Sequence, residues 1–319
     1  MSNQYVFTKE HNLTVTYKKA IQPFWQNEVT QGDFQGVKNV KIAYAFIKHP
    51  QPIGSIVISS GRIESMLKYK EVVFDLFQNG YSVFIHDHRG QGLSGRMLEN
   101  KQMGYVDDFF DYVADFKAFM DQVVLLHSQH RPNLLCHSMG GAIGALTILR
   151  YPTLFKNVAF SAPMFGIRPA LPDWFANILL NLHDSLNQQV AYFFGQKDYE
   201  RHPFENNNLS HSQIRYYLFR EEYQYSPEVQ LGGVTGHWLR AARQAMEEIE
   251  QRAAEFPIPG LALQAGSDTI VDNTRQTRVV RNMPNTRLNV IAGAKHELLE
   301  EQDQYRVPCL TEILGFFAE

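Results

Sequence analysis

The feature that most constrains the fold is a regular alternation of short apolar runs with stretches of helical period. Ile53–Ile58 and Tyr81–Ile85 are largely apolar and lack polar alternation, which is typical of strands covered on both faces. Between them, Met66–Gln78 has helical spacing and stops at Asn79-Gly80, a signal for the end of a helix. Strands and helices that alternate in this way predict a mostly parallel sheet flanked by helices.

The same pattern runs through most of the chain. Further strands are expected at 133–136, 157–160, 260–264 and 287–291, and helices at 107–127, 139–150, 273–282 and 303–317. Two more strands are expected near the N-terminus, at 13–20 and 38–47, with turn residues at Gly32, Asp33 and Gly36 between them.

The alternation stops between Pro163 and Phe256. Polar, aromatic-rich and helical segments fill this stretch, and none of them has the pattern of a buried strand. We interpret the stretch as a helical cap inserted into the sheet domain. The expected domains are therefore a core made of 1–162 and 257–319, and a cap made of 163–256.

Composition and charge exclude several classes of function. Lys and Arg number 30 against 33 Asp and Glu, a net charge of −3, so no broad cationic face is expected for a nucleic acid. Cys136 and Cys309 are the only cysteines, too few for a disulfide scaffold or a cysteine-ligated zinc site. No apolar run is long enough to span a bilayer, and the N-terminus lacks the pattern of a secretion signal. The cytoplasm is therefore the expected compartment.

The sharpest local motif is Cys136-His137-Ser138-Met139-Gly140-Gly141, between a predicted strand and a helix rich in small residues. A serine there projects its hydroxyl from a tight strand-to-helix turn, and its neighbours must be small to let the turn close. Free N–H groups at the helix start favour developing negative charge. The alternative interpretation of Ser138 is an ordinary helix N-cap.

A serine nucleophile needs a general base and a carboxylate that orients the base. Asp268 and Asp272 follow one predicted strand directly, and His296 follows the next. The carboxyl ends of parallel strands meet at one edge of the sheet, where such proteins hold their sites. The sequence thus predicts a Ser138, Asp268 and His296 triad. Asp268 is preferred because it lies nearer the strand, whereas Asp272 is suited to cap the next helix.

Hydrolysis through a serine also needs two donors for the oxyanion. The N–H of Met139, directly after the serine, is one candidate. The N–H of Arg62 is the other, in the loop Ser59–Glu64, where Gly61 allows the backbone to turn inward. No metal is expected, because His86-Asp87-His88 is too short and isolated to specify a ligand set.

With these residues assembled, the chain resembles the α/β-hydrolase family, and within it the monoacylglycerol lipase and bacterial lysophospholipase branch. The similarity covers nearly the whole chain and rests on Asp87–Gly95, His137–Gly141, Ala162–Ile167, Gly232–Trp238 and Val271–Asn273. It implies an α/β-hydrolase fold and the same roles for Ser138, Asp268, His296, Arg62 and Met139. The chain departs from the family pattern where Ser60-Gly61 replaces the usual His-Gly, and where Cys136 replaces a glycine.

The expected activity is hydrolysis of the carboxyl ester of a lysophospholipid or monoacylglycerol through an acyl-enzyme, with release of a fatty acid and no cofactor. Two alternatives remain. One is a peptidase of the proline-iminopeptidase kind, with Glu205, Glu221 and Glu222 as candidates to hold the substrate amine. The other is a binding protein that keeps the fold without the chemistry.

The cap carries the expected determinants of substrate choice. Its aromatic residues, including Phe165 and Trp238, either line an acyl channel or pack the cap onto the sheet. Arg168, Arg215 and Arg220 are candidates for a phosphate head group, or else solvated helix residues. The amphipathic stretch 171–182 is a candidate for peripheral contact with the inner face of the cytoplasmic membrane.

Overall fold

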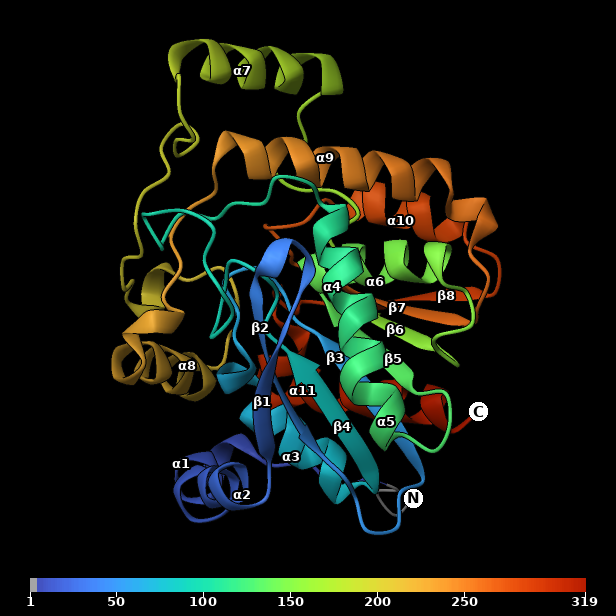
Figure 1. The fold of residues 1–319 in the computed structure, drawn as a ribbon. Coiled ribbons are helices and arrows are strands. Elements are labelled where there is room, and N and C mark those ends of the chain that lie inside the picture. The colour runs from blue at the N-terminus through green and yellow to red at the C-terminus, as the bar shows by residue number, and fades with distance from the viewer. Residues whose placement is uncertain (1–4) are drawn as a thin grey trace.

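A computed structural model describes residues 5–319 and contains a twisted eight-stranded sheet (Figure 1). The strand order is β1-β2-β4-β3-β5-β6-β7-β8. Strands β3 to β8 are parallel, and β1 and β2 continue the sheet antiparallel at one edge. The strands are β1 (Thr30–Gln35), β2 (Lys41–Ile47), β3 (Gly54–Ser59), β4 (Tyr81–His86), β5 (Asn133–His137), β6 (Val158–Ser161), β7 (Gly260–Ala265) and β8 (Thr286–Ile291).

Helices cover both faces of the sheet because successive strand residues point to opposite sides. In β5, Leu134 belongs to one apolar cluster and Leu135 to the other, and both are fully buried. The first cluster includes α4 (Phe110–Phe119), α6 (Met139–Arg150), α9 (Gly236–Gln251) and α10 (Asn273–Arg281). The second includes α3 (Lys70–Gln78) and α11 (Asp303–Ala318). The predicted α/β-hydrolase sheet with helices on both faces is confirmed.

Of the two strands predicted near the N-terminus, the one at 38–47 is confirmed as β2 and the one at 13–20 is wrong. Residues 13–27 form one helical segment: α1 (Leu13–Thr16), a π-helical turn (Tyr17–Ile21) and α2 (Gln22–Asn27). Leu13, Tyr17 and Ile21 recur every fourth residue and form one buried stripe, so helical period prevails over the apparent alternation. The stretch interpreted as a turn, around Gly32, is instead β1, paired with β2.

Between β6 and β7 the described chain contains no strand of the sheet and three α-helices, α7 (Asp173–Leu186), α8 (Gln213–Tyr225) and α9. Helix α7 lies beyond α9, at the top of Figure 1, and α9 packs on α6. Helix α8 is fixed to the core through Arg215, whose guanidinium binds Glu71 at 2.9 Å and Asp303 at 3.0 Å. The helix preceding β5 ends with α5 (Leu125–His127), which continues α4 through a π-helical stretch.

Candidate active site

Three loops at one edge of the sheet carry the predicted catalytic residues. Ser138 directly follows β5, Asp268 lies three residues beyond the end of β7, and His296 lies beyond the end of β8. Because β5, β7 and β8 are parallel members of one sheet, their carboxyl ends face the same side. The topology therefore brings together side chains that are 158 positions apart in the chain.

Ser138 stands on a strained turn. Its backbone has φ 50° and ψ −118°, a conformation that L-residues rarely adopt. The residue two positions after the serine must be glycine, because a Cβ on Gly140 would come within 2.0 Å of the Ser59 carbonyl oxygen. Cys136 is fully buried beneath α6, and a Cβ on Gly144 would meet its Sγ at 2.5 Å. A small non-glycine residue at position 136 is therefore matched by a glycine on the facing helix.

A chain of hydrogen bonds links the three side chains. His296 Nε2 lies 2.9 Å from Ser138 Oγ, and His296 Nδ1 lies 2.7 Å from Asp268 Oδ2. The other carboxylate oxygen of Asp268 accepts the N–H groups of Ile270 and Val271 at 2.8 and 3.1 Å. Burial alone would raise the pKa of Asp268, but the bond to His296 and these two N–H groups hold it below its ordinary value. Asp268 is thus held ionised beside the imidazole.

Asp272, the alternative acid, faces another way. Its Oδ1 accepts the N–H of Thr274 at 3.0 Å and caps the first turn of α10. The two aspartates differ by only four positions, yet one bonds the imidazole and the other a helix terminus. The residue nearer the strand end is the one in contact with His296.

The two expected oxyanion donors belong to Met139, directly after this serine, and to Arg62, which lines the same cavity as the serine. Met139 is the first residue of α6, so its N–H has no acceptor within the helix. The Arg62 N–H lies in the loop after β3, in which Ile63 has a φ of 68°. Gln91 steadies that loop, since its amide nitrogen donates to the carbonyls of Gly61 at 2.8 Å and Glu64 at 2.9 Å. Gln91 belongs to the Asp87–Gly95 motif, whose structural purpose was not predicted.

A buried ionic network supports both sides of the site, and the sequence analysis missed it. Lys68 Nζ lies 2.6 Å from Glu64 in the loop after β3 and 2.6 Å from Glu297, next to the histidine. Glu64 also accepts the Tyr69 hydroxyl at 2.6 Å and the Gly61 N–H. Burial opposes ionisation of Glu64, but Lys68 outweighs it and lowers the pKa of Glu64 to about 2. The network ties the loop of Arg62 to the loop of His296.

A cavity of about 430 Å³ opens over Ser138 and His296. Its other walls come from the loop after β3, the segment 195–202 and helix α8, which contributes Phe219 and Arg220. Phe165 and Trp238, the two expected substrate-binding residues, are not among the residues that line it. Phe165 is fully buried against Phe160, and Trp238 donates to the Tyr112 hydroxyl at 3.3 Å. Both side chains pack in the core.

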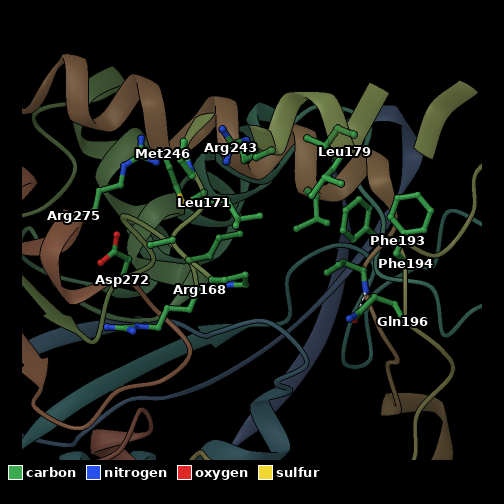
Figure 2. A pocket seen from close by; sticks show the side chains of 18 of the residues that line it. Arg168, Leu171, Leu179, Phe193, Phe194, Gln196, Arg243, Met246, Asp272 and Arg275 are labelled. Carbon is green, nitrogen blue, oxygen red and sulfur yellow. Dashed lines mark hydrogen bonds between the residues drawn. The ribbon is translucent and has the colours of Figure 1, made fainter. Parts of the chain in front are cut away.

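A second cavity, of about 620 Å³, lies beneath α7. Figure 2 shows Arg168, Asp272 and Arg275 towards one end of it, and Phe193, Phe194 and Gln196 towards the other. Much of its remaining wall is aliphatic, from Ile167, Leu171, Leu179, Leu180, Val234, Leu239 and Met246. Gln196 lines both cavities, so the apolar cavity lies next to the catalytic one.

Within residues 5–319, no group of three or more His, Cys, Asp or Glu side chains is arranged to hold a metal ion. His86 is buried against Phe116 and Phe119, and burial holds its pKa well below the ordinary value. His88 lies 3.2 Å from the Ser59 hydroxyl. These two histidines are part of the packed core behind the loop after β3.

Comparison with known proteins agrees with this geometry. Residues 50–303 match the family model described as serine aminopeptidase, S33. The chain is 35% identical to lysophospholipase L2 of Escherichia coli, over 97% of this chain and 93% of that protein. It is 26% identical to a monoacylglycerol lipase of Mycolicibacterium smegmatis, over 86% and 92%. A monoglyceride lipase variant from Saccharomyces cerevisiae has the same fold, with a TM-score of 0.69 and 17% identity over 91% and 94% of the two chains.

The match to the family model covers more than half of the chain, and the resemblance to the lysophospholipase and monoacylglycerol lipase branch is confirmed. The chain therefore belongs to the S33 serine aminopeptidase family, as a serine hydrolase with the α/β-hydrolase fold on the branch of the bacterial lysophospholipases.

Proposed function

We propose that this protein hydrolyses the carboxyl ester of a lysophospholipid or a monoacylglycerol and releases a fatty acid. The observation that carries the proposal is the hydrogen-bonded chain from Ser138 through His296 to Asp268, with distances of 2.9 and 2.7 Å. The relatives named lysophospholipase and monoacylglycerol lipase support the choice of substrate class.

In the first half of the reaction, His296 Nε2 removes the proton of Ser138 as the hydroxyl oxygen attacks the acyl carbonyl carbon. The N–H groups of Met139 and Arg62 bind the negative oxygen that forms. Collapse of the intermediate breaks the ester bond, and His296 returns its proton to the departing alcohol. Asp268 fixes the imidazole orientation and stabilises the charged ring.

In the second half, a water molecule takes the position of the alcohol. His296 removes its proton, the hydroxide attacks the acyl-serine, and the fatty acid leaves as Ser138 regains its proton. Every proton that His296 takes up is returned within the cycle. These steps use only side chains and backbone amides of the chain itself.

The second cavity is suited to the acyl chain. Its aliphatic lining beneath α7 would take an apolar tail out of water, and it lies next to the catalytic cavity, with Gln196 in the wall of both. In this arrangement the segment 163–256 acts as the cap over a core of 1–162 and 257–319. Part of that cap is joined firmly to the core, because α9 packs on α6 within the main apolar cluster.

The test is turnover of a lysophosphatidylethanolamine and of the matching monoacylglycerol by wild type and by Ser138→Ala. Ester hydrolysis should vanish in the variant, and an organophosphonate probe should label wild type alone. Ser161→Ala is a matched control, because Ser161 ends the neighbouring strand β6 and its hydroxyl has no described partner. Hydrolysis of either ester by folded Ser138→Ala would refute the proposal, and an unlabelled wild type would favour the binding protein.

Aminopeptidase activity is the competing function. It is tested by measuring how fast the same purified wild-type protein hydrolyses a prolyl amide. None of the three expected amine-binding carboxylates lines the catalytic cavity. Glu222 pairs with Lys70 and accepts the Tyr17 hydroxyl at 2.8 Å. We therefore expect the ester to be hydrolysed far faster than the prolyl amide.

We infer that α7 also contacts the membrane that supplies the lipid. Its outer face exposes five large apolar side chains, Trp174, Phe175, Ile178, Leu182 and Leu186, an arrangement typical of interfacial helices. No helix in residues 5–319 is long and apolar enough to cross a bilayer. A cytoplasmic protein with this helix would bind the inner face of the cytoplasmic membrane.

Co-sedimentation with vesicles of phosphatidylethanolamine and phosphatidylglycerol tests this contact. Changing Trp174 and Ile178 together to serine should reduce the bound fraction several-fold. Leu126→Ser, which alters an equally exposed apolar residue on α5, should leave it unchanged. Equal binding by both variants would exclude α7 as the contact.

A further inference from the structure

Arg220 is a buried cation with an unusual set of neighbours. Its side chain, on α8, lines the catalytic cavity and is only 8% exposed. The guanidinium lies over the rings of Tyr216, Phe219 and Tyr199, at 4.9, 5.0 and 5.7 Å from their centroids. No carboxylate lies within 4 Å of it among the described residues, and its Nε has no hydrogen-bond partner there.

The other buried arginines of the described chain all have carboxylate partners. Arg89 lies 2.6 Å from Asp115, Arg215 lies 2.9 Å from Glu71, and Arg306 lies 2.7 Å from Asp75. A buried charge without a counterion costs free energy that aromatic faces offset only in part. Arg220 therefore differs from these three arginines, which serve the fold, and unlike them it lines the catalytic cavity.

Arg62 adds a second cation to the same wall. Its Nη1 donates to the Gly232 carbonyl at 3.1 Å, and its guanidinium lies 5.6 Å from the Trp238 ring. It too has no carboxylate within 4 Å among residues 5–319. Burial lowers the pKa of Arg62 to about 10, which leaves the group charged at neutral pH. Hydrogen bonds to Tyr216 and Tyr199 engage part of the Arg220 guanidinium, but its Nε–H has no partner among the described residues, and Arg62 uses its Nη1 for the Gly232 carbonyl.

The carboxylates of this cavity are already engaged elsewhere. Glu64 and Glu297 both bind Lys68. Asp198 accepts the hydroxyl of Tyr192 and the amide of Asn100, and Glu200 pairs with Lys197. The positive charge of Arg220 and Arg62 thus remains unmatched within the empty site.

We propose that Arg220, assisted by Arg62, binds the phosphate of a lysophospholipid head group while the acyl carbonyl lies at Ser138. This proposal rests on the proposed ester hydrolysis and adds to it a preference for phosphate-bearing substrates over monoacylglycerols. Phosphate and ester carbonyl are only a few bonds apart in such a lipid, so one cavity holds both. Guanidinium groups suit phosphate because they donate several N–H bonds in one plane.

The test compares kcat/KM for a lysophosphatidylethanolamine with that for the monoacylglycerol of the same acyl chain. In Arg220→Gln the ratio of the two values should fall by about 10- to 100-fold, the effect of losing a hydrogen bond to a charged group. Arg201→Gln is the matched control, because Arg201 is exposed, binds Gln224 and is not part of the cavity wall. The control should keep the wild-type ratio.

Glycerol 3-phosphate, glycerol and inorganic phosphate serve as inhibitors. Glycerol 3-phosphate should compete with the lysophospholipid in wild type far better than glycerol or inorganic phosphate, and this advantage should shrink in Arg220→Gln. Arg220→Lys, which keeps the charge but not the planar donors, should have an intermediate ratio. If Arg220→Gln does not fold, the substrate ratio of Arg220→Lys and the inhibition of wild type by glycerol 3-phosphate still test the proposal.

Several results would overturn the proposal. An unchanged ratio in folded Arg220→Gln, or equal losses on both substrates, would assign Arg220 to packing against its aromatic neighbours. Strong Arg220-dependent inhibition by inorganic phosphate, with an unchanged ratio, would indicate a site for the free ion. None of these results bears on the ester hydrolysis itself, which is tested separately by the activity of Ser138→Ala and by labelling of wild type with the organophosphonate probe.

Discussion

Replacing Lys68 by methionine tests whether the buried network stabilises the site through charge or through packing. The Lys68 side chain is 2% exposed and lies 2.6 Å from both Glu64 and Glu297. Methionine keeps most of the aliphatic volume and removes the ammonium. Two carboxylates are then buried without their common counterion, and breaking a buried ion pair in this way costs about 3–5 kcal/mol.

The pKa of Glu64 gives an independent magnitude. Lowering it from an ordinary 4.5 to about 2 corresponds to roughly 3 kcal/mol, at about 1.4 kcal/mol per pKa unit. A carboxyl whose pKa is lower in the folded state stabilises the protein above its unfolded pKa, and this stability is lost as the pH falls towards 2. At pH 8 the full contribution is present in wild type and absent in Lys68→Met.

Urea unfolding followed by tryptophan fluorescence at pH 8 and pH 5 measures the effect. At pH 8 the variant should lose about 3–5 kcal/mol of unfolding free energy. At pH 5 the loss should be less than half of that, because the freed carboxyls take up protons at little cost so near their unfolded pKa. The contribution of Glu64 to wild-type stability should change little, since Glu64 remains ionised at both pH values, and the loss in the variant is therefore taken against wild type at the same pH.

Lys117→Met is the matched control. Lys117 also pairs with a carboxylate four residues away, Asp121, and lies 5.4 Å from the centroid of the Tyr151 ring, but it is 29% exposed. Its loss should stay below about 1 kcal/mol at both pH values. An equal loss in Lys68→Met at pH 5 and pH 8 would refute the argument from the two carboxylates, and loss of the ammonium that lies 4.6 Å from the centroid of the Phe219 ring would then account for the effect.

Two further predictions concern single carboxyl groups. Asp268→Asn should lower kcat by about 10³- to 10⁴-fold because it removes the charge that orients His296. Asp272→Asn should leave both kcat and helix stability nearly unchanged, because the amide oxygen of asparagine can still accept the Thr274 N–H and cap α10. Comparable losses of kcat in both variants would contradict the assignment of the acid. Burial, together with the charge of Glu71, raises the pKa of Glu300 to about 8, so the folded protein retains a proton that the unfolded chain gives up. Wild type should therefore lose about 1 kcal/mol of unfolding free energy per pH unit between roughly pH 5 and 8, and Glu300→Gln should lack this loss; parallel pH profiles in chemical denaturation would exclude Glu300 as the source.

The sequence predicted the strands around Ser138, Asp268 and His296 because each residue directly follows a buried strand, and parallel topology brings such loops together. The choice of Asp268 over Asp272 rested on the same logic, and only Asp268 contacts the imidazole. Their catalytic roles remain predictions until the variants are assayed.

The N-terminal region was harder because its local pattern is ambiguous. Leu13-Thr14-Val15-Thr16-Tyr17 alternates like a strand, yet packing of Leu13 with Tyr17 and Ile21 selects a helix. Contacts between distant positions were also invisible. Lys68 lies 229 positions before Glu297, and nothing near either residue in the sequence indicates that they meet.

The sequence also does not show which arginine of the cap faces the catalytic cavity. Arg168, Arg215 and Arg220 had the same standing as candidates for a head group, although Arg215 is committed to Glu71 and Asp303. Arg168 lines the cavity beneath α7, and Arg220 the one over Ser138. Their roles are distinguished only by the groups that each guanidinium contacts in the structure.

The unequal attachment of α7 and α8 has a consequence for selectivity. Helix α8 is joined to the core by the ion pairs of Arg215 and by Glu222, which binds Lys70. Helix α7 rests mainly on α9 and has a solvent-facing apolar side. If the substrate binds as proposed, we expect sharp discrimination at its polar end, which meets rigid walls, and acceptance of tails of different lengths at the other end, where one helix has room to yield.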